Sequence, residues 1–313
     1  MREMTITAND AGQRLDRFLQ KALPGLPGTL AQKYIRTKRI KVDGKRTERS
    51  YRLSEGDTIQ LYIGDEFFEQ ALDLGLYLSI SDPALSICYE DEHILLVNKP
   101  PSILCHSSTD PEEVTLVDQV KAYLYQSGGW DPKVEQSFVP ALSNRLDRNT
   151  GGLVIAAKSA ASQRILNEKL RDGEIDKYYL LAVCGRPVPD CGRIEGHLVK
   201  DRANNIVHVA EAHEADAKTA VLEYQTLKTT GDVSLVECKL ITGRSHQIRV
   251  QMASLGTPIL GDRKYGGGDL EPYQALWAYR LRFSFTSDAG ALAYLDGREF
   301  RSIEPPFVAR WFS

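Results

Sequence analysis

The segment NRLDRNTGGLVIAAKS, residues 144–159, joins a charged loop to a strongly apolar run. Asp147 stands between two arginines, and two glycines precede the apolar residues 153–157. An apolar run of this length, bounded by turn residues, is typical of a buried strand. Binding and catalytic residues often lie on loops that such a scaffold positions. The segment therefore predicts a buried strand and makes Asp147, on the loop before it, a candidate functional carboxylate.

Strand-like runs outnumber helical patterns on both sides of this segment. The runs occupy residues 94–97, 178–183, 220–227, 234–240 and 278–285, and helical spacing marks residues 117–124 and 165–170. Because strands and helices do not alternate regularly, we expect an α+β fold with a mixed, mostly antiparallel sheet over residues 86–313. Gly151 and Gly152 would allow close approach of another backbone or of a ligand.

The first 64 residues predict a separate small α/β domain. Leu15, Phe18, Leu19 and Ala22 have helical spacing, and Pro24 follows them as a helix stop. A second helix is expected from about residue 29, and short strands at 40–42 and 59–63. Residues 65–85 have no clean period, so we interpret them as a linker between this domain and the larger one at 86–313.

Positive charge is concentrated in the small domain. Residues 14–52 carry twelve lysines and arginines against three acids, although the whole chain has a formal net charge of −3. Such asymmetry indicates that this segment meets a polyanion. The structural alternative is a solvated charged face, which explains most charge runs.

Composition excludes several classes of protein. The chain has 313 residues, 42% hydrophobic and 26% charged, which is typical of globular domains. No apolar run approaches the length of about 18 residues that a membrane span needs, and the first residues lack the pattern of a signal peptide, so we expect a cytoplasmic protein. The five cysteines and six histidines follow no metal-binding or disulfide pattern, and we expect no metal.

A second polar segment, LITGRSHQIRVQMASLGTPILGDRKYG, covers residues 240–266. It reads as a strand, a turn at Gly243 and a helix that carries Arg244, His246 and Arg249, followed by a turn-rich stretch. Arginines at such a junction suit phosphate or carboxylate recognition. Taken alone, the pattern equally fits a capped helix with solvated arginines.

The small domain resembles the alpha-L RNA-binding domain of a ribosomal protein, some tRNA synthetases and several RNA-modifying enzymes. The resemblance rests on RLDRFL, RIKVDGK and LSEGDTIQLYI and covers about residues 12–64. It implies that the basic surface of this domain binds RNA. The candidate RNA-binding residues are Arg36, Lys38, Arg39, Lys41, Lys45 and Arg46.

The rest of the chain, about residues 86–313, resembles the RluA-type RNA pseudouridine synthases. The resemblance rests on five segments in the family's order: HILLVNKP (93–100), NRLDRNTGG (144–152), DKYYLLAVCG (176–185), LITGRSHQIRV (240–250) and QALWAYRLRFSF (274–285). It implies a mixed-sheet catalytic domain that converts uridine in RNA to pseudouridine without a cofactor or metal.

The resemblance also assigns roles to individual residues. Asp147 is implied to be the catalytic residue, Tyr179 to stack on the target base and take part in proton transfer, and Arg244 to pair with Asp147. The other residues that it places at the substrate are Arg145, Leu281, His246 and Arg249.

Four positions depart from the family's usual residues. Asn144 and Trp277 stand where many relatives have histidine, Gly151 where serine is common, and Gln251 where a second histidine follows the helix arginine. None of these departures removes Asp147, and they indicate a subgroup of the family.

These observations favour an RNA pseudouridine synthase that acts on large-subunit ribosomal RNA. The alternatives are a transfer-RNA synthase of the same family and a noncatalytic RNA-binding or ribosome-assembly factor on this scaffold. A small-molecule glycosidase or lyase is disfavoured, because the basic domain would be superfluous for a sugar substrate. RNA is the expected partner, and the sequence implies no membrane and no protein partner.

Overall fold

The computed structural model describes residues 1–68, 75–106, 110 and 112–313. The chain divides into two compact units that are not consecutive in sequence: unit 1 comprises Met1–Pro83, Val117–Ala141 and Ala157–Arg164, and unit 2 comprises Ala84–Leu116, Leu142–Ala156 and Ile165–Ser313. Residues 69–74 of the predicted linker lie outside the described residues, between the 3-10 helices η1 (Asp65–Phe67) and η2 (Leu76–Ser79). The domain boundaries at residues 64 and 85 stay predictions.

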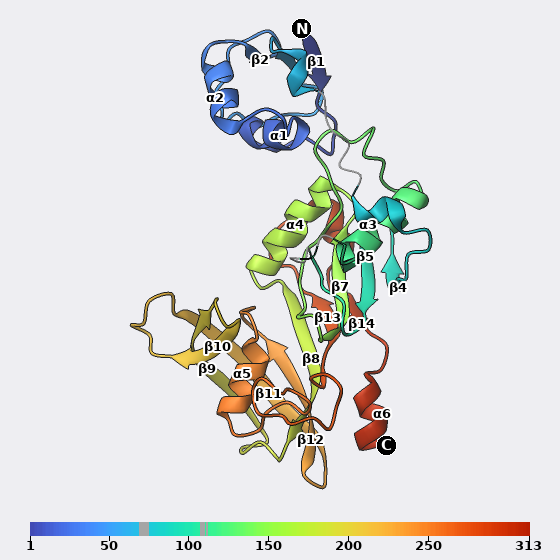
Figure 1. The fold of residues 1–313 in the computed structure, drawn as a ribbon, viewed down its shortest axis with the longest axis vertical. Coiled ribbons are helices and arrows are strands. Elements are labelled where there is room, and N and C mark those ends of the chain that lie inside the picture. Colours follow the sequence, from blue (N-terminus) through green and yellow to red (C-terminus); the bar gives the residue numbers. More distant parts are fainter. Residues whose placement is uncertain (69–74, 107–109, 111) are drawn as a thin grey trace. The chain divides into compact units, whose positions relative to one another are not determined.

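Unit 1 contains the predicted small α/β fold. Its first elements are β1 (Arg2–Thr5), α1 (Leu15–Ala22), α2 (Gly28–Arg36), β2 (Ile40–Val42) and β3 (Thr58–Leu61). The strands form an antiparallel sheet in the order β1-β3-β2. Figure 1 shows β1 and β2 of this sheet above α1. The four residues with helical spacing in α1 are buried and pack in one core with Ile35, Ile40 and Ile59. The helix and strand assignments for this segment are confirmed.

Unit 2 is built on one large sheet. Its strands are β4 (Ser86–Glu90), β5 (Ile94–Lys99), β6 (Ala141–Leu142), β7 (Gly151–Ala157), β8 (Ile175–Cys184), β9 (Cys191–Asp201), β10 (Ile206–Ala210), β11 (Lys218–Thr230), β12 (Val233–Leu240), β13 (Leu276–Phe283) and β14 (Glu299–Arg301). The main path runs β10-β9-β11-β12-β8-β13-β7-β5-β4. Antiparallel pairs predominate, and β13 and β7 pair in parallel. The predicted α+β class with a mixed sheet is confirmed.

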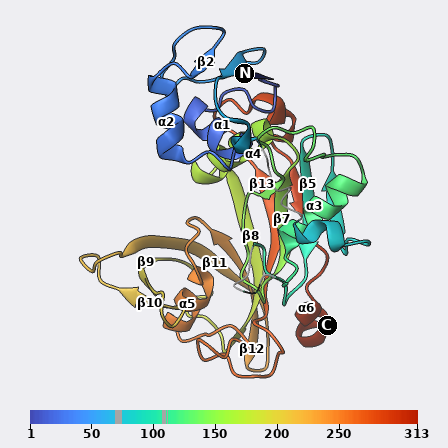
Figure 2. The ribbon, with the colours of Figure 1, turned by 45° about the horizontal axis from the view of Figure 1, so that its top comes forward.

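The remaining helices are few and short. They are α3 (Leu116–Gln126), α4 (Ala160–Arg171), α5 (Gln247–Ser254), the 3-10 helix η3 (Gly290–Leu295) and α6 (Pro306–Phe312). Helix α5 lies beside β9, β10 and β11 (Figure 2), where Val250 packs with Leu198, Val207 and Ala220. This packing holds α5 against the sheet and so fixes the position of its N-terminal turn, which carries Gln247 and Arg249. Among the described residues, no helix combines the length and apolar character needed to cross a membrane.

The parallel pairing of β7 with β13 explains one of the two glycines. A Cβ atom on Gly152 would lie 2.2 Å from the carbonyl oxygen of Ala278, and the φ of Gly152 is +113°. Only glycine adopts this backbone conformation without strain. Gly152 therefore serves the close approach of a second backbone, which was one of the two readings of the sequence.

Candidate active site

A cavity of about 1050 Å³ opens in unit 2 beside the start of β7. Asp147 lines it from the loop before β7, Tyr179 from β8, and His246 and Arg249 from the N-terminal end of α5. The cavity thus brings together side chains from three segments that are far apart in the sequence. Asp147 keeps 33% of its side chain exposed, so that its carboxylate faces the open space.

Arg249 links Asp147 to a second, fully buried carboxylate. Its Nη1 donates to Asp147 Oδ2 at 3.1 Å, while Nε and Nη2 donate to the two carboxylate oxygens of Asp262 at 2.6 and 2.8 Å. The bidentate contact fixes the plane of the guanidinium, because a planar fork matches a planar carboxylate. Burial disfavours the charged form of Arg249, but the hydrogen bonds and charges of Asp262 and Asp147 outweigh it and raise its pKa. One cation is therefore shared between two carboxylates.

The pairing expected for Arg244 is wrong: Arg249 makes it instead. Helix α5 begins at Gln247, so Arg244 lies on the loop before the helix and not on the helix itself. The side chain of Gln247 accepts the backbone N–H of Arg244 at 3.0 Å and shapes this loop. Arg244 Nε then donates to the carbonyl oxygen of Thr219, which directs its guanidinium to the rim of the cavity.

The strands contribute Tyr179 of β8 and Leu240 of β12 to the lining of the cavity. Tyr179 is only 6% exposed, and burial, together with the charge of Asp147, raises its pKa and keeps its hydroxyl protonated. Leu276 of β13 lines a smaller pocket of about 100 Å³ that shares Asp147 and Tyr179 with this cavity. Leu281, the expected apolar wall, does not line it, because it lies farther along β13, opposite Lys177, and is 2% exposed.

Lys99 fastens the loop that carries Asp147. The side chain is fully buried, and its Nζ donates to the carbonyl oxygens of Pro100, Ile103 and Arg148 at 2.8–2.9 Å. Burial lowers the pKa of Lys99 to about 8. The end of β5 and the residue after Asp147 are thereby held together by one ammonium group.

His246 has contacts on both ring nitrogens. Its Nδ1 lies 2.7 Å from the hydroxyl oxygen of Tyr265, and its Nε2 lies 3.9 Å from Asp147 Oδ2. Burial lowers the pKa of His246, against the opposing charge of Asp147, so the imidazole is neutral at neutral pH.

Cations surround the opening of the cavity. Those that line it are Arg145, Arg148, Arg171, Lys177, Lys200, Arg244, Arg249 and Lys264. Asp147 is the one carboxylate among the described lining residues. Arg171, Lys200 and Lys264 were not identified from the sequence, because they come from α4, β9 and the turn after α5 and share no local pattern. A rim of this kind suits a polyanionic substrate.

Two of the four departures have structural roles in the described chain. Asn144 Oδ1 accepts the backbone N–H of Ile155 at 2.8 Å, and its Nδ2 donates to the Leu153 carbonyl, so it ties its loop to β7. Gln251 is buried and donates to the carbonyl oxygens of Ile194 and Ala220. Both residues satisfy backbone groups of the sheet.

The other two departures form a complementary pair. A Cβ atom on Gly151 would lie 2.2 Å from Cζ3 of Trp277, far inside van der Waals contact. The two residues are partners in the parallel β7–β13 pairing. The indole of Trp277 fills the space above Gly151 and donates to Ser302 Oγ at 2.9 Å. Trp277 therefore leaves no room for a side chain at position 151.

Gly151→Ser is expected to lower the free energy of unfolding by about 1–3 kcal/mol, the usual cost of overpacking a core. Trp277→His in the same chain should restore much of this loss, because the smaller ring makes room for a side chain at position 151. Urea unfolding of the two single variants and the double variant measures the coupling. Gly196→Ser, on β9 with open space around its Cβ position, is the matched control. Additive losses in the double variant would contradict the pairing.

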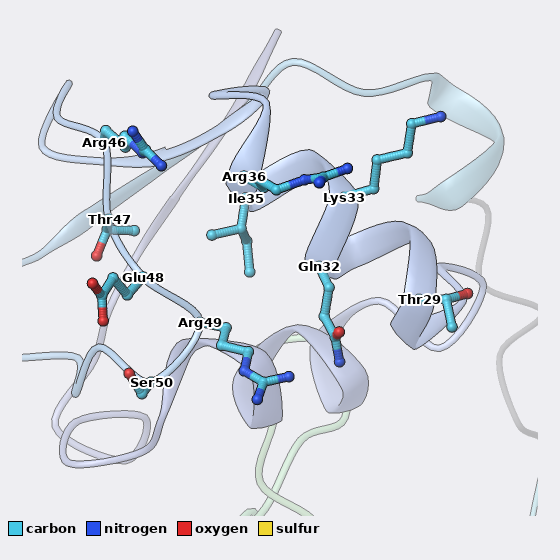
Figure 3. A pocket seen from close by; sticks show the side chains of 10 residues that line it. All are labelled: Thr29, Gln32, Lys33, Ile35, Arg36, Arg46, Thr47, Glu48, Arg49 and Ser50. Atoms are coloured by element: carbon cyan, nitrogen blue, oxygen red, sulfur yellow. The ribbon is translucent and has the colours of Figure 1, made fainter.

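A separate groove of about 730 Å³ lies in unit 1 between α2 and residues 46–50. Figure 3 shows Ile35 between the two sides, with the charged ends of Arg36, Arg46 and Arg49 around it. Arg36 and Arg46 are among the predicted RNA-binding residues, whereas Arg49 was not among them. With Lys33, four cations line the groove against the single carboxylate of Glu48.

The other four predicted RNA-binding cations do not line this groove. Lys38, Arg39 and Lys45 are exposed, and Lys41 is half-buried. Arg39 lies over the ring of Tyr34 at 5.0 Å, and the Lys41 ammonium lies 5.2 Å from the ring of Tyr62. The predicted set is therefore divided between the groove and the neighbouring surface of the same small domain.

The described residues contain no group of three or more His, Cys, Asp or Glu side chains able to hold a metal ion.

Comparisons with known proteins agree with this arrangement. Residues 93–254 match the family model described as RNA pseudouridylate synthase, and residues 13–59 match that of the S4 domain. The chain is 33% identical to "Ribosomal large subunit pseudouridine synthase C" of Rickettsia bellii, over 86% of this chain and 88% of that protein. The protein of the same name from Escherichia coli is 30% identical over 86% of this chain and 81% of its own length.

A solved structure supports the fold. The structure titled "Human RNA Pseudouridylate Synthase Domain Containing 4" aligns with a TM-score of 0.57 and 22% identity, covering 75% of this chain and 93% of that one. At this identity the likeness concerns the architecture of the sheet alone.

Proposed function

The chain belongs to the RNA pseudouridylate synthase family, and from this premise we propose that it isomerises uridine to pseudouridine in large-subunit ribosomal RNA. The observation that carries the proposal is the cavity in which Asp147, held by Arg249, faces the buried Tyr179 within a rim of cations. The names of the relatives from Rickettsia bellii and Escherichia coli support the choice of ribosomal RNA. We also propose that the protein acts in the cytoplasm.

The reaction breaks an N-glycosidic bond, turns the uracil and rejoins it to the ribose through C5. Asp147 is the reacting carboxylate, either as nucleophile at the sugar or as base at C2′. Arg249 keeps this carboxylate oriented and stabilises its charge. No second carboxylate is required, because no water has to be delivered to the sugar.

The target nucleotide has to leave the RNA stack to reach Asp147, at a cost of a few kcal/mol. Tyr179 repays part of this cost by stacking on the base, and its buried hydroxyl remains available for proton transfer. Arg145 is exposed at the opening, where it meets the phosphates or fills the gap that the base leaves. Arg244 acts at the rim as a phosphate contact, since Arg249 has the place beside Asp147.

Tritium release tests the proposal directly. Transcripts of large-subunit RNA, small-subunit RNA and transfer RNA are labelled at C5 of uridine, and release is followed under single-turnover conditions. We expect release from the large-subunit transcript. Release from transfer RNA alone would identify the transfer-RNA synthase instead. Tight, salt-sensitive binding without release from any transcript would identify the noncatalytic factor.

The basic groove of unit 1 is proposed to bind the RNA backbone. Its lining is cationic and contains no aromatic side chain, which suits phosphates rather than stacked bases. Replacing Arg36 and Arg46 together by glutamine should weaken binding of all RNA sequences alike. The slope of log Kobs against log salt should fall by roughly 0.7–0.9 for each lost phosphate contact.

A salt titration of filter binding measures this slope. Arg186→Gln is the control, because Arg186 is an exposed cation of unit 2 that pairs with Asp190. An unchanged slope in the Arg36/Arg46 variant would overturn the assignment of the groove.

A further inference from the structure

The turn that follows α5 places a phenol against the buried side of His246. The hydroxyl oxygen of Tyr265 accepts the backbone N–H of Val207 at 2.9 Å and lies 2.7 Å from His246 Nδ1. Val207 belongs to β10, so this oxygen is fixed from the sheet side as well as from the turn. Burial raises the pKa of Tyr265, which keeps the phenol protonated.

These contacts decide where the imidazole proton lies. A phenol has one hydrogen to donate, and its oxygen is already accepting from Val207. Among the described residues, Nδ1 of His246 is the one acceptor within hydrogen-bond distance of the Tyr265 hydroxyl. The phenol therefore donates to Nδ1, and a neutral imidazole that accepts at Nδ1 carries its proton on Nε2.

The protonated nitrogen faces the cavity. Nε2 lies 3.9 Å from Asp147 Oδ2, which is too long for a hydrogen bond and leaves room for an acceptor beside the carboxylate. We propose that Tyr265 is a positioning residue that holds His246 in its Nε2–H tautomer, so that this N–H donates to an oxygen of the target nucleotide next to Asp147. The donation to a nucleotide rests on the proposed function, whereas the tautomer does not.

The surrounding charges favour the same neutral state. Arg249, Lys264 and Lys200 face the ring from α5, the following turn and β9, and each opposes a positive imidazole. Among these groups, only Asp147 favours the positively charged imidazole. A neutral donor serves an uncharged oxygen without adding a further cation to the site.

The ring of Tyr265 has a separate packing role, which allows the hydroxyl to be tested alone. The guanidinium carbon of Arg249 lies 5.0 Å from the ring centroid, and the His246 ring packs edge-on at 5.7 Å. Tyr265→Phe keeps both ring contacts and removes the hydroxyl, and with it the donor to Nδ1 and the acceptor of the Val207 N–H.

Nitrogen NMR of histidine-labelled protein reads the tautomer directly. At neutral pH we expect His246 of the wild type to show a protonated Nε2 and an unprotonated Nδ1. In Tyr265→Phe the preference should be lost, and kcat for tritium release should fall about tenfold with little change in KM for RNA. Tyr273→Phe, a more exposed tyrosine beyond the same turn, should change neither reading.

A pair of substitutions at His246 tests the donor independently of Tyr265. The amide nitrogen of glutamine reaches the position of Nε2, whereas that of asparagine reaches only the position of Nδ1. His246→Gln should therefore retain more of the wild-type kcat than His246→Asn.

Three results would overturn the inference. They are a proton on Nδ1 in the wild type, an unchanged tautomer or unchanged kcat in Tyr265→Phe, and an asparagine variant as active as the glutamine variant. Failure of the proposed function gives a different result, because tritium release would then be absent from the wild type while the NMR spectra could still be read.

Discussion

Asp147→Asn is expected to lower the rate of tritium release by at least about 10³-fold. An amide can act neither as a nucleophile at the sugar nor as a base at C2′, so either role for Asp147 predicts the same loss. The side chain keeps nearly the same shape, and Arg249 retains both hydrogen bonds to Asp262. The loss should therefore fall on the chemical step. Single-turnover release with enzyme in excess measures this step alone.

Binding separates this effect from damage to the site. The cations at the rim and in the groove of unit 1 are unchanged, so the Kd for RNA should stay close to that of the wild type. Asp288→Asn, at an exposed turn where the carboxylate accepts the Gly290 N–H, should leave release unaffected. Substantial release by Asp147→Asn would remove Asp147 from the chemistry.

Asp262→Ala is expected to lower the free energy of unfolding by about 3 kcal/mol. Asp262 is 1% exposed and takes two of the three charge-assisted hydrogen bonds that Arg249 makes. Without it, a buried guanidinium keeps only its contact with Asp147. Removing one partner of a buried ion pair is costly because the remaining charge is not compensated by water, and here one hydrogen bond to the partly exposed Asp147 has to replace three. Denaturant unfolding measures the difference.

Asp190→Ala provides a control with the same chemistry in water. Arg186 donates to both carboxylate oxygens of Asp190 at 2.7 and 2.6 Å, as Arg249 does to Asp262, but this pair is exposed. Surface pairs contribute little to stability, so the unfolding curve of Asp190→Ala should match that of the wild type. Equal losses in both variants would show that burial does not determine the strength of the Arg249 contact.

The sequence predicted the features that depend on local pattern. Residues 153–157 form the buried strand β7, and α1 buries the four residues with helical spacing. The local pattern made Asp147 a candidate, the resemblance to a known family added Tyr179, and the structure places both on one cavity. Their catalytic roles stay predictions that the proposed experiments test.

The sequence could not choose between Arg244 and Arg249 as the partner of Asp147. The choice depends on where α5 begins, and the left-handed backbone of His246 (φ +50°) sets that point. Sequence patterns locate helix ends poorly, and a shift of one turn moves a different arginine into the site. Asp262, which anchors Arg249, lies in a turn whose sequence gives no sign of burial.

The cations at the opening of the cavity also could not be grouped from the sequence. Arg171, Lys200 and Lys264 come from separate elements, and only the curvature of the sheet and the packing of α5 bring them to one opening. The charge run at residues 14–52 was visible because it is local. The pairing of Gly151 with Trp277 could not be predicted, because the two residues lie on strands that are far apart in the sequence.

The position of β13 has a consequence for the order of assembly. This strand lies between β8, which carries Tyr179, and β7, which follows Asp147, although it comes later in the sequence than either of them. A nascent chain that has not yet released residues 276–283 from the ribosome lacks the strand that joins the two halves of the sheet. Long-range contacts of this kind form late, because the loop they close is long. The cavity is therefore completed only after residues 276–283 have left the ribosome, and a shorter nascent chain cannot hold its reacting carboxylate and its tyrosine in one cavity.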